Sequence, residues 1–302
     1  WWLVLVYAMF GAAWLISRRR KVRYWIPAAC SVLALCAVLT VNAVQLQRTS
    51  TVTALDVSQG QSIVFSSGRA CAVVDCGGRS TAEDPGDLAA RKLLAQGHRS
   101  LDLLVLTHPH DDHVNGVLRL MHWLPVRTLV IPAAADTTQA PLSDILALAE
   151  ANHTAVVRVD AERTVTAGGI SVHLYPEPCA GQEDGSMIVL ASIGDYDTLV
   201  PGDVDMTAEV KFLSSCTYPG IELLLVGHHG SKRSTSDAWL DAIAPDAAII
   251  SVGYNTYGHP TSETLERLQA HNIPIYRTDQ MGDITVHLSV SYTHLRAHET
   301  SA

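Results

Sequence analysis

The chain has 302 residues, of which 48% are hydrophobic, and a formal net charge of -9. This length can bury a real core as one large domain or two modest ones. The first 50 positions hold no acidic residue and six of the 21 Lys and Arg, so residues 51–302 carry 15 basic and 30 acidic side chains, a net charge of -15. A domain that held nucleic acid mainly by neutralising phosphates would not be this acidic, so a polyanionic substrate would need metal ions and a local basic patch.

Two apolar runs, residues 1–16 and 25–44, open the chain on either side of a basic loop at residues 18–23. The second run holds 20 uncharged residues, the length that crosses a bilayer as an α-helix. Short basic loops stay in the cytoplasm, so we expect residues 1–47 to make two spans of a multi-pass plasma-membrane protein, with the rest of the chain on the outer face. A signal peptide is the alternative, which the basic hairpin fits poorly. Because the chain begins at Trp1 rather than Met, we expect a fragment cut inside its first span.

From residue 51 onward, short apolar strands alternate with amphipathic helices. The run at residues 101–106 is almost entirely apolar, which is typical of a strand buried on both faces. This rhythm predicts an α/β domain over residues 51–290. Residues 291–302 break the pattern and resemble a translated adapter sequence, so we expect a non-native tail there. The expected strands lie at 52–57, 62–65, 70–75, 101–106, 128–131, 156–159, 170–174, 187–191, 198–200, 222–226 and 247–252, and the expected helices at 87–96 and 142–152 and after 114 and 206.

The most specific motif is His-Pro-His-Asp-Asp-His at residues 108–113, directly after the buried strand. Imidazoles and carboxylates are ligands of first-row metals, and a tight turn lets alternate residues face two adjacent ions. A His-rich surface loop, the alternative, would not explain why the cluster stands where a buried strand ends. The sequence therefore predicts metal ligands at His108, His110, Asp112 and His113.

This motif resembles the HxHxDH loop of the metallo-β-lactamase fold superfamily, and the resemblance extends over about residues 51–290. More narrowly, the chain is similar to the carboxyl-terminal domain of the ComEC family of competence DNA-uptake channel proteins. That similarity rests on the stretches LDVSQGQ at 55–61, DCGG at 75–78, VPGD at 200–203, VGHHGSK at 226–232 and YGHP at 257–260. The resemblance implies a four-layer αββα sandwich that follows two transmembrane helices and binds two divalent ions, Zn or Mn.

The resemblance also implies roles for residues at other strand ends. Asp203 would bridge both metals, although a helix-capping Asp is the alternative. Asp56 would brace the His loop from behind, as carboxylates do for ligating imidazoles, or would simply form a turn. His228 and His229 are adjacent and would point opposite ways in an extended chain, so only one can easily be a ligand while the other contacts substrate phosphate. The sequence does not decide between them.

Three further residues, Ser231, Lys232 and Ser234, stand at an expected helix start, where free N–H groups and hydroxyls suit a phosphate. A solvated helix start is the alternative. His259, in a Gly-His-Pro turn, is a candidate general acid or phosphate contact. We take Asp112, Lys232 and His259 as candidate catalytic residues, and Ser231 and Ser234 as candidate substrate contacts.

The chain departs from the superfamily pattern before Asp203. Superfamily hydrolases usually carry another His ligand there, but residues 182–186 contain none and offer only Asp184. His122, His153 and His173 are poorly placed substitutes. Gln61 also replaces an acidic residue that is common after the Gln-Gly pair. One of the two metal sites is therefore expected to be weak.

Four of the six cysteines lie after residue 50, and whether they can form disulfides depends on the compartment that the domain faces. Cys71, Cys76, Cys179 and Cys216 would face an oxidising side under the expected topology, so the sequence allows one or two disulfides among them and leaves open whether and how they pair.

Three hypotheses for function follow. The first is an extracytoplasmic metal-dependent phosphodiesterase, a nuclease domain that degrades one DNA strand while the other enters a competence channel, together with other competence proteins. The residues themselves indicate only metal-assisted hydrolysis, and the resemblance supplies single-stranded DNA as the substrate. The second is a hydrolase of small esters or phosphorylcholine on the same scaffold. The third is a non-catalytic DNA-docking or gating module. The sequence leaves the oligomeric state open.

Overall fold

The computed structural model describes residues 2–20, 23, 25–79, 83–176, 186–288 and 293–297. The chain divides into two compact units, Trp1–Arg48 and Thr49–Ala302. The first unit consists of α1 (Trp2–Arg20) and α2 (Trp25–Arg48), which pack against each other. Both expected apolar runs are therefore helical. Among the described residues, however, no helix combines the length and the apolarity that crossing a bilayer requires, so the two expected membrane spans are not confirmed.

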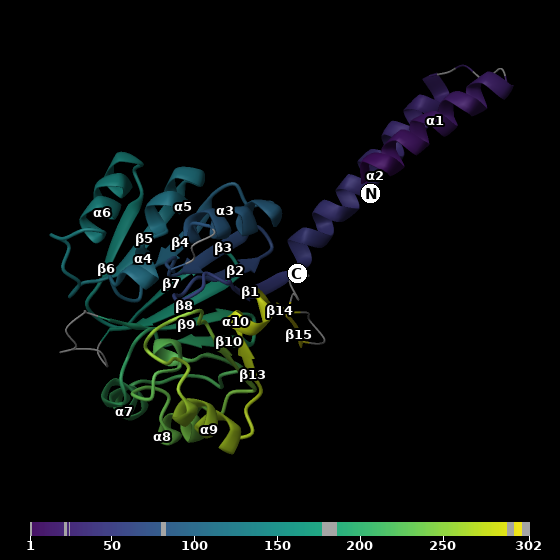
Figure 1. Cartoon of the computed structure of the whole chain (residues 1–302). Helices are drawn as coiled ribbons and strands as arrows, with labels where there is room; N and C mark the ends of the chain where they lie inside the picture. The colour runs from purple at the N-terminus through teal and green to yellow at the C-terminus, as the bar shows by residue number, and fades with distance from the viewer. Residues whose placement is uncertain are drawn as a thin grey trace. The chain divides into compact units, whose positions relative to one another are not determined.

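The second unit is built on two β-sheets, drawn in Figure 1 between two groups of helices. The first sheet has eight strands in the order β15-β14-β1-β2-β3-β4-β5-β6, and the second has seven in the order β13-β12-β11-β10-β9-β8-β7. The strands of the first sheet are β1 (Ser50–Ala54), β2 (Ile63–Ser67), β3 (Ala70–Val74), β4 (Leu101–Val105), β5 (Val126–Pro132), β6 (Ala155–Val159), β14 (Ile284–Leu288) and β15 (Thr293–Ala297). Those of the second are β7 (Arg163–Ala167), β8 (Ile170–Tyr175), β9 (Ile188–Ile193), β10 (Tyr196–Val200), β11 (Leu223–Leu225), β12 (Ala247–Ile250) and β13 (Ile275–Arg277).

Helices cover the outer face of each sheet. On the first sheet these are α3 (Pro85–Ala95), the short α4 (Asp111–Val114), α5 (Val117–Trp123) and α6 (Leu142–Ala151). On the second they are α7 (Met206–Ser215), α8 (Asp237–Ile243) and α9 (Ser262–Ala270), while the one-turn α10 (Thr278–Met281) follows β13. The Asp84 side chain caps α3, and Ser236 caps α8 through a hydrogen bond to the amide of Trp239.

Three apolar cores separate these layers. One lies between the sheets and combines Phe65 of β2 with Val189 of β9. A second joins the first sheet to α3 and α5, and a third joins the second sheet to α7 and α8 around Trp239. β4 contributes to two cores, because Leu103 faces the other sheet whereas Leu104 faces the helices. Burying such a Leu stabilises the fold by about 2 kcal/mol, and the resulting α/β/β/α layering confirms the expected sandwich.

The structure corrects the expected order of elements near the carboxyl end. We expected residues 247–252 to form the last strand, but α9, β13, α10 and β14 follow. β14 is short and carries a Thr and a His among its five residues. Its place in the core is set by pairing with β1, more than 200 positions earlier, which a local pattern cannot reveal. Within the expected tail, Thr293–Ala297 forms β15 beside β14, and the origin of that tail stays a prediction.

The disulfide expectation also changes. Cys71 and Cys76 are buried free thiols, each covered by the apolar core beneath α3. Burial raises the pKa of the Cys71 thiol to about 12, so it is unreactive at neutral pH. Cys179 lies outside the described residues.

Candidate metal centre

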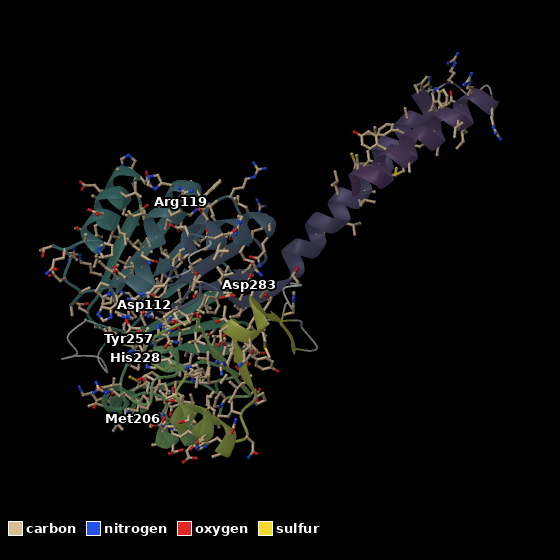
Figure 2. All side chains as sticks on the ribbon, in the orientation of Figure 1. Asp112, Arg119, Met206, His228, Tyr257 and Asp283 are labelled. Carbon is tan, nitrogen blue, oxygen red and sulfur yellow. The ribbon has the colours of Figure 1, made fainter. Side chains whose placement is uncertain are left out.

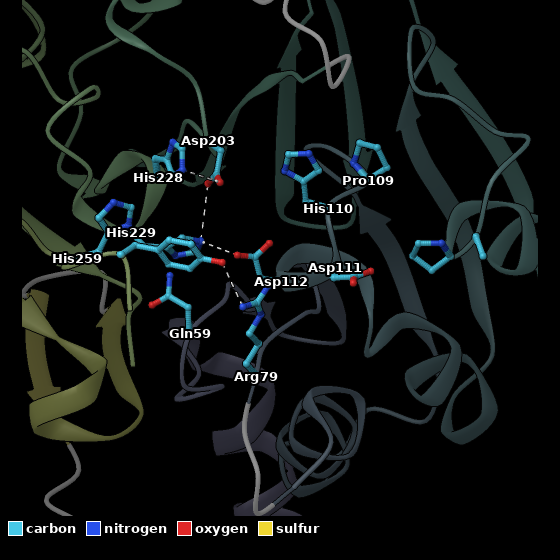
Figure 3. Close-up of a pocket in the computed structure, with 13 residues that line it drawn as sticks. Gln59, Arg79, Pro109, His110, Asp111, Asp112, Asp203, His228, His229 and His259 are labelled. Carbon is cyan, nitrogen blue, oxygen red and sulfur yellow. Dashed lines mark hydrogen bonds and ion pairs between the residues drawn. The ribbon is translucent and has the colours of Figure 1, made fainter. Parts of the chain in front are cut away.

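The candidate site lies at one end of the sandwich, where strands of both sheets end. Figure 2 labels Asp112, His228 and Tyr257 there, and all three line one cavity of about 460 Å³. The first sheet delivers the loop after β4, and the second delivers the segments after β10, β11 and β12. The lining residues are Gln59, Arg79, Pro109, His110, Asp111, Asp112, Ala140, Pro141, Asp203, His228, His229, Tyr257 and His259 (Figure 3).

The backbone of the 108–113 loop is held by its neighbours. The amide of Gln61 donates to the carbonyl of Asp112 at 3.0 Å, and the amide of Cys76 donates to the carbonyl of His113 at 2.8 Å. Gly77 follows directly, and a Cβ there would lie 2.4 Å from the amide nitrogen of His113. Only glycine allows this approach, so the stretch at 75–78 fixes where the loop stands.

Asp203 stands between two groups of imidazoles. Its Oδ1 lies 3.2 Å from His113 Nε2 and 3.8 Å from His229 Nε2. Its Oδ2 lies 3.8 Å from His108 Nε2 and 3.6 Å from His228 Nε2. One carboxylate thus presents a different oxygen to each group, which is the arrangement that a residue bridging two ions requires.

Asp112 completes the group on the Oδ1 side. Its Oδ2 lies 3.6 Å from His229 Nε2. Ligand atoms of Asp112, His113 and His229 lie within 4.8 Å of one another, as do those of His108, His113 and Asp203. Both sets therefore converge closely enough to hold a metal ion.

The unsatisfied atoms test whether a metal fits. Among the described residues, His108 Nε2, His113 Nε2, His229 Nε2 and Asp203 Oδ1 are buried and make no hydrogen bond of good geometry, although His113 Nε2 and Asp203 Oδ1 approach to 3.2 Å as an ion pair. Buried polar atoms are normally paired, because leaving one unpaired costs about 1–3 kcal/mol. Here they face one another and form a nitrogen and oxygen donor set, which suits a first-row divalent ion. The residues present therefore fit a metal.

Each of these imidazoles is oriented through its other nitrogen. His113 Nδ1 lies 2.8 Å from Asp75 Oδ2, His229 Nδ1 lies 2.8 Å from the carbonyl of Ser251, and His108 Nδ1 lies 3.0 Å from the Thr107 hydroxyl. Such partners fix the tautomer and aim Nε2 at the metal position.

The bracing carboxylate differs from our expectation. The Asp56 carboxylate accepts from the amide of Ser58 at 3.1 Å, which closes a local turn. Asp75 instead contacts the His loop, because it accepts from the amide and hydroxyl of Thr107, both at 2.7 Å, and from Gln61 Nε2 at 2.7 Å. Gln61, which we noted only as a departure from the family, thus helps to hold Asp75.

His228 and His229 both turn toward Asp203. We expected adjacent residues to point in opposite directions, as in extended chain. They instead lie in a short turn, Gly227–Gly230, with φ of 52° and 53°, in the left-handed region. The side chain of His228 is 38% exposed and that of His229 is buried. Left-handed backbone is costly for residues other than glycine and concentrates at functional sites.

Electrostatics support cation binding at the same place. Burial raises the pKa of the Asp203 carboxyl, but His113, His229 and His108 together outweigh this effect and hold the pKa well below its usual range. Burial likewise lowers the pKa of His113, yet Asp203 and Asp75 hold it well above its usual range. Burial and the neighbouring His113 hold the pKa of His108 well below its usual value. A proton on His113 therefore occupies the position that a metal would take, and the two compete.

The expected phosphate contacts are not in the cavity. The Ser234 hydroxyl is buried and donates to the carbonyl of Val204 at 2.5 Å, while Ser231 is buried and accepts from the amide of Arg233 at 3.3 Å. Lys232 is exposed but does not line the cavity. These positions were predicted from an expected helix start, but α8 begins later, at Asp237.

His110 and His259 do line the cavity. The His110 ring centroid lies 4.7 Å from that of His108. The His259 ring lies 5.5 Å from that of His228, and its Nδ1 is buried without a partner among the described residues. Both backbone groups of His259 are bound by the Asn255 amide, at 3.0 and 2.8 Å, which fixes the turn.

Other predicted or overlooked positions can now be placed. His122, His153 and His173 do not line the cavity, and Asp184 lies outside the described residues. Sequence reasoning missed Arg79 and Tyr257 as site residues. Arg79 directly follows the quoted DCGG stretch and Tyr257 begins the YGHP stretch, so their positions beside motif residues were the available signal.

Known proteins resemble this chain in sequence and in fold. The chain is 29% identical to ComE operon protein 3 of Bacillus subtilis over 251 residues, which cover 76% of this chain and 32% of that protein. It is 29% identical to Competence protein ComA of Neisseria gonorrhoeae over 238 residues, covering 76% and 31%. The chain thus spans about a third of the length of these relatives. The crystal structure of Zn²⁺-bound PqqB from Methylobacterium extorquens superposes with a TM-score of 0.51 at 16% identity, covering 79% of this chain and all of that one, which shows a common fold.

The family is established by the sequence pattern itself. The pattern of the metallo-beta-lactamase superfamily matches residues 55–254, which include the 108–113 loop, Asp203 and both histidines of the Gly227–Gly230 turn. This chain belongs to the metallo-beta-lactamase superfamily.

Proposed function

We propose that this protein is a metal-dependent phosphodiesterase that cleaves DNA, with single-stranded DNA as its substrate. The observation that carries the proposal is the Asp203 carboxylate, whose two oxygens each face a separate group of imidazole nitrogens. One ion would be held on the Oδ2 side by His108, His110 and His228. The other would be held on the Oδ1 side by Asp112, His113 and His229.

His228 lies beside the proposed metal site that we expected to be the weaker of the two. The superfamily histidine before Asp203 is missing, and His228 Nε2 stands 3.6 Å from Asp203 Oδ2, on the side of His108. We propose that His228 supplies the missing nitrogen donor, which makes binding of two ions, Zn or Mn, feasible. A bound divalent ion supplies Lewis-acid chemistry: it neutralises charge on a phosphodiester and activates water at neutral pH.

The remaining task is proton transfer, for which His259 is the best-placed group. Burial lowers the pKa of its imidazole, and the neighbouring His228 and His229 lower it further, so the ring is neutral at pH 7. The ring lines the cavity, and a neutral imidazole there can exchange a proton with a leaving oxygen, which is the role of a general acid or base. Asn255 holds its backbone and so limits its movement.

The DNA substrate is supported by the relatives. Proteins named for competence and recombination, including Recombination protein 2 of Haemophilus influenzae, match 76–77% of this chain. We propose by extension that the domain works with other competence proteins during DNA uptake. Its position outside the plasma membrane is likewise a proposal, resting on the basic residues 18–23. A periplasmic reporter fused after residue 302 would be inactive if this topology were wrong.

The central test is a nuclease assay on the full chain with Zn²⁺ and Mn²⁺ titrated separately. Replacing His108 and His110 together with Ala should abolish metal-dependent cleavage of single-stranded DNA. His173→Ala, which changes a histidine that hydrogen-bonds Thr164 on the neighbouring strand, is the matched control and should cleave normally. Unchanged cleavage in the double variant would overturn the proposal.

The two alternative functions predict different results in substrate and metal-content assays. A small-ester or phosphorylcholine hydrolase, which the acidic balance of residues 51–302 favours, would act on small esters and leave DNA intact. A non-catalytic docking module would bind less than one metal ion per chain. Metal content and a substrate panel therefore separate all three.

A further inference from the structure

Acidic side chains outnumber Arg and Lys among the described residues that line the cavity. Three carboxylates line it, Asp111, Asp112 and Asp203, but among its described lining residues Arg79 alone is an Arg or Lys. Residues 51–302 carry a net charge of -15, so the domain as a whole does not attract a polyanion. Two divalent ions would offset the carboxylates at the reacting phosphate. Neighbouring phosphates of a polymer would still need a cation, and Arg79 is placed to provide one.

Arg79 is held against an exposed aromatic ring from the opposite side of the cavity. Its Nη1 donates to the Tyr257 hydroxyl at 3.2 Å, and its guanidinium carbon lies 6.0 Å from the centroid of that ring. Figure 3 shows the side chain of Arg79 extending toward Asp112. Arg79 comes from the segment after β3, whereas Tyr257 comes from the loop after β12, so the pair joins the two walls of the cavity.

The backbone around this pair is fixed. The amide of Arg79 donates to the carbonyl of Gln59 at 2.9 Å, and the amide of Tyr257 donates to Asn255 Oδ1 at 3.1 Å. The ends of both side chains remain accessible, because Tyr257 is 59% exposed and Arg79 is also exposed. Tyr254, on the same loop, is 90% exposed. Large exposed aromatics beside a cation make the surface that single-stranded nucleic acids use.

We propose that Arg79 and Tyr257 bind the nucleotide next to the scissile phosphate, with the guanidinium on its phosphodiester and the phenol ring stacked on its base. This inference rests on the proposed function and adds how an acidic domain selects a polymer. Arg pairs with phosphate through two parallel N–H groups, and stacking accepts any base. A small diester has neither a second phosphate nor a base, so it gains nothing from the pair.

The test is steady-state kinetics of the full chain on a single-stranded oligothymidylate and on methyl 4-nitrophenyl phosphate. Arg79→Ala should lower kcat/KM on the oligonucleotide by about ten-fold or more, chiefly through KM, and by much less on the small diester. The slope of log kcat/KM against log salt should become shallower by about 0.7, the value for one phosphate contact on a single strand. Arg79→Lys should keep the salt slope while losing part of the affinity, because Lys retains the charge but lacks the two parallel N–H donors of the guanidinium.

Two variants of Tyr257 distinguish stacking of its ring on a base from positioning of Arg79 by its hydroxyl. Tyr257→Phe removes only the hydroxyl that holds Arg79 and should cost little, whereas Tyr257→Ala should lose about ten-fold in oligonucleotide affinity. Arg119→Ala, which removes an exposed arginine paired with Asp87 on the helical face, is the control for charge loss and should match wild type. An oligodeoxyuridylate and an oligouridylate assayed side by side differ only in the 2′-hydroxyl and so distinguish DNA from RNA.

The outcomes distinguish a failure of the proposed nucleotide contact from a failure of the proposed nucleic-acid substrate. If the wild type cleaves the oligonucleotide and Arg79→Ala cleaves it with unchanged KM and salt slope, the nucleotide contact is wrong while the proposed function stands. Equal losses on both substrates would also overturn it, since they would reveal a purely structural role. If the wild type cleaves only the small diester, the nucleic-acid substrate itself is wrong.

Discussion

Asp75 accepts a hydrogen bond from the Nδ1 of His113 at 2.8 Å, while the Nε2 of the same ring lies 3.2 Å from Asp203 Oδ1. The imidazole is therefore held between the Asp75 carboxylate behind it and the Asp203 carboxylate in front of it. Both contacts are buried. Asp75 is the most heavily bonded carboxylate near the site, and it also fixes Thr107 at the start of the metal loop.

Asp75→Asn should weaken metal binding by about 10–100-fold, as the loss of a carboxylate behind a ligating histidine typically does. The amide is uncharged and has one acceptor oxygen instead of two, so it cannot accept from the Thr107 amide and from His113 together, and the His113 ring is held less firmly. Competition with a chromogenic chelator measures the affinity. Asp56→Asn is the matched control, because the Asp56 carboxylate accepts from the amide of Ser58 in a local turn, and the backbone bond from Asp56 to Asp283 is kept in the variant. Weakened metal binding in Asp56→Asn with wild-type affinity in Asp75→Asn would return the bracing role to Asp56.

Much of the fold is readable from local pattern. The run at residues 101–106 is apolar because Leu103 and Leu104 enter different cores, so it predicts a strand covered on both faces. β14 could not be placed in this way, because its partner β1 lies at the other end of the domain and its own five residues are of mixed polarity. Pairing between distant strands is a tertiary property that no short window contains.

The site residues also differ in how far the sequence predicts them. The 108–113 loop and Asp203 follow from residue type and position at strand ends. The geometry of His228 and His229 does not, because a left-handed turn replaces the extended chain that we assumed. Ser234 was misassigned for a related reason: its hydroxyl serves the carbonyl of Val204, and side-chain contacts across a loop leave no periodic trace in sequence.

Removing metal should destabilise the protein. A bound metal would contact only the folded site and would satisfy three imidazole nitrogens and one carboxylate oxygen that make no hydrogen bond of good geometry there. At a free concentration a hundred times Kd, such binding stabilises by about 2.7 kcal/mol, which corresponds to a Tm increase of roughly 5–10 °C for a domain of this size. Calorimetry with EDTA and with added Zn²⁺ measures the shift. The His108→Ala and His110→Ala double variant should show a much smaller shift, and an unchanged Tm in wild type would mean that the site binds no metal.

Ser234→Ala should reduce stability rather than substrate affinity. The variant leaves the buried carbonyl of Val204 without its donor, which costs about 1 kcal/mol in urea unfolding. KM should not change, because Ser234 does not line the cavity. Lys232→Ala, a change at an exposed neighbour, should alter stability by less than about 0.5 kcal/mol. A raised KM in the Ser234 variant with normal stability would restore the substrate contact that we first expected.

His98 should make stability depend on pH, away from the metal site. Its Nε2 contacts the Ser66 hydroxyl at 2.7 Å, and burial lowers the pKa of its imidazole below the ordinary value of 6.5. The unfolded chain therefore binds a proton before the folded chain does. The stability contributed by the neutral ring is complete above pH 6.5 and is lost as the pH falls through the lower folded pKa. Urea unfolding at about pH 7.5 and about pH 5.5 should show a smaller loss in His98→Gln than in wild type. His122→Gln, at an exposed helical position, should behave as wild type does.

Gly77→Ala tests whether the metal loop depends on close backbone packing. An added Cβ would lie 2.4 Å from the amide nitrogen of His113 and 2.5 Å from the carbonyl carbon of Asp112, and both are backbone atoms that cannot rotate away. The loop must shift, which should cost about 1–3 kcal/mol of stability and at least about ten-fold in metal affinity as His113 moves away from Asp75 and Asp203. Gly220→Ala is the matched control, because its Cβ would find its nearest neighbour, a flexible Glu222 oxygen, at 3.9 Å. Chelator competition and urea unfolding on both variants measure the two effects, and wild-type affinity in Gly77→Ala would show that the loop holds its ligands without this contact.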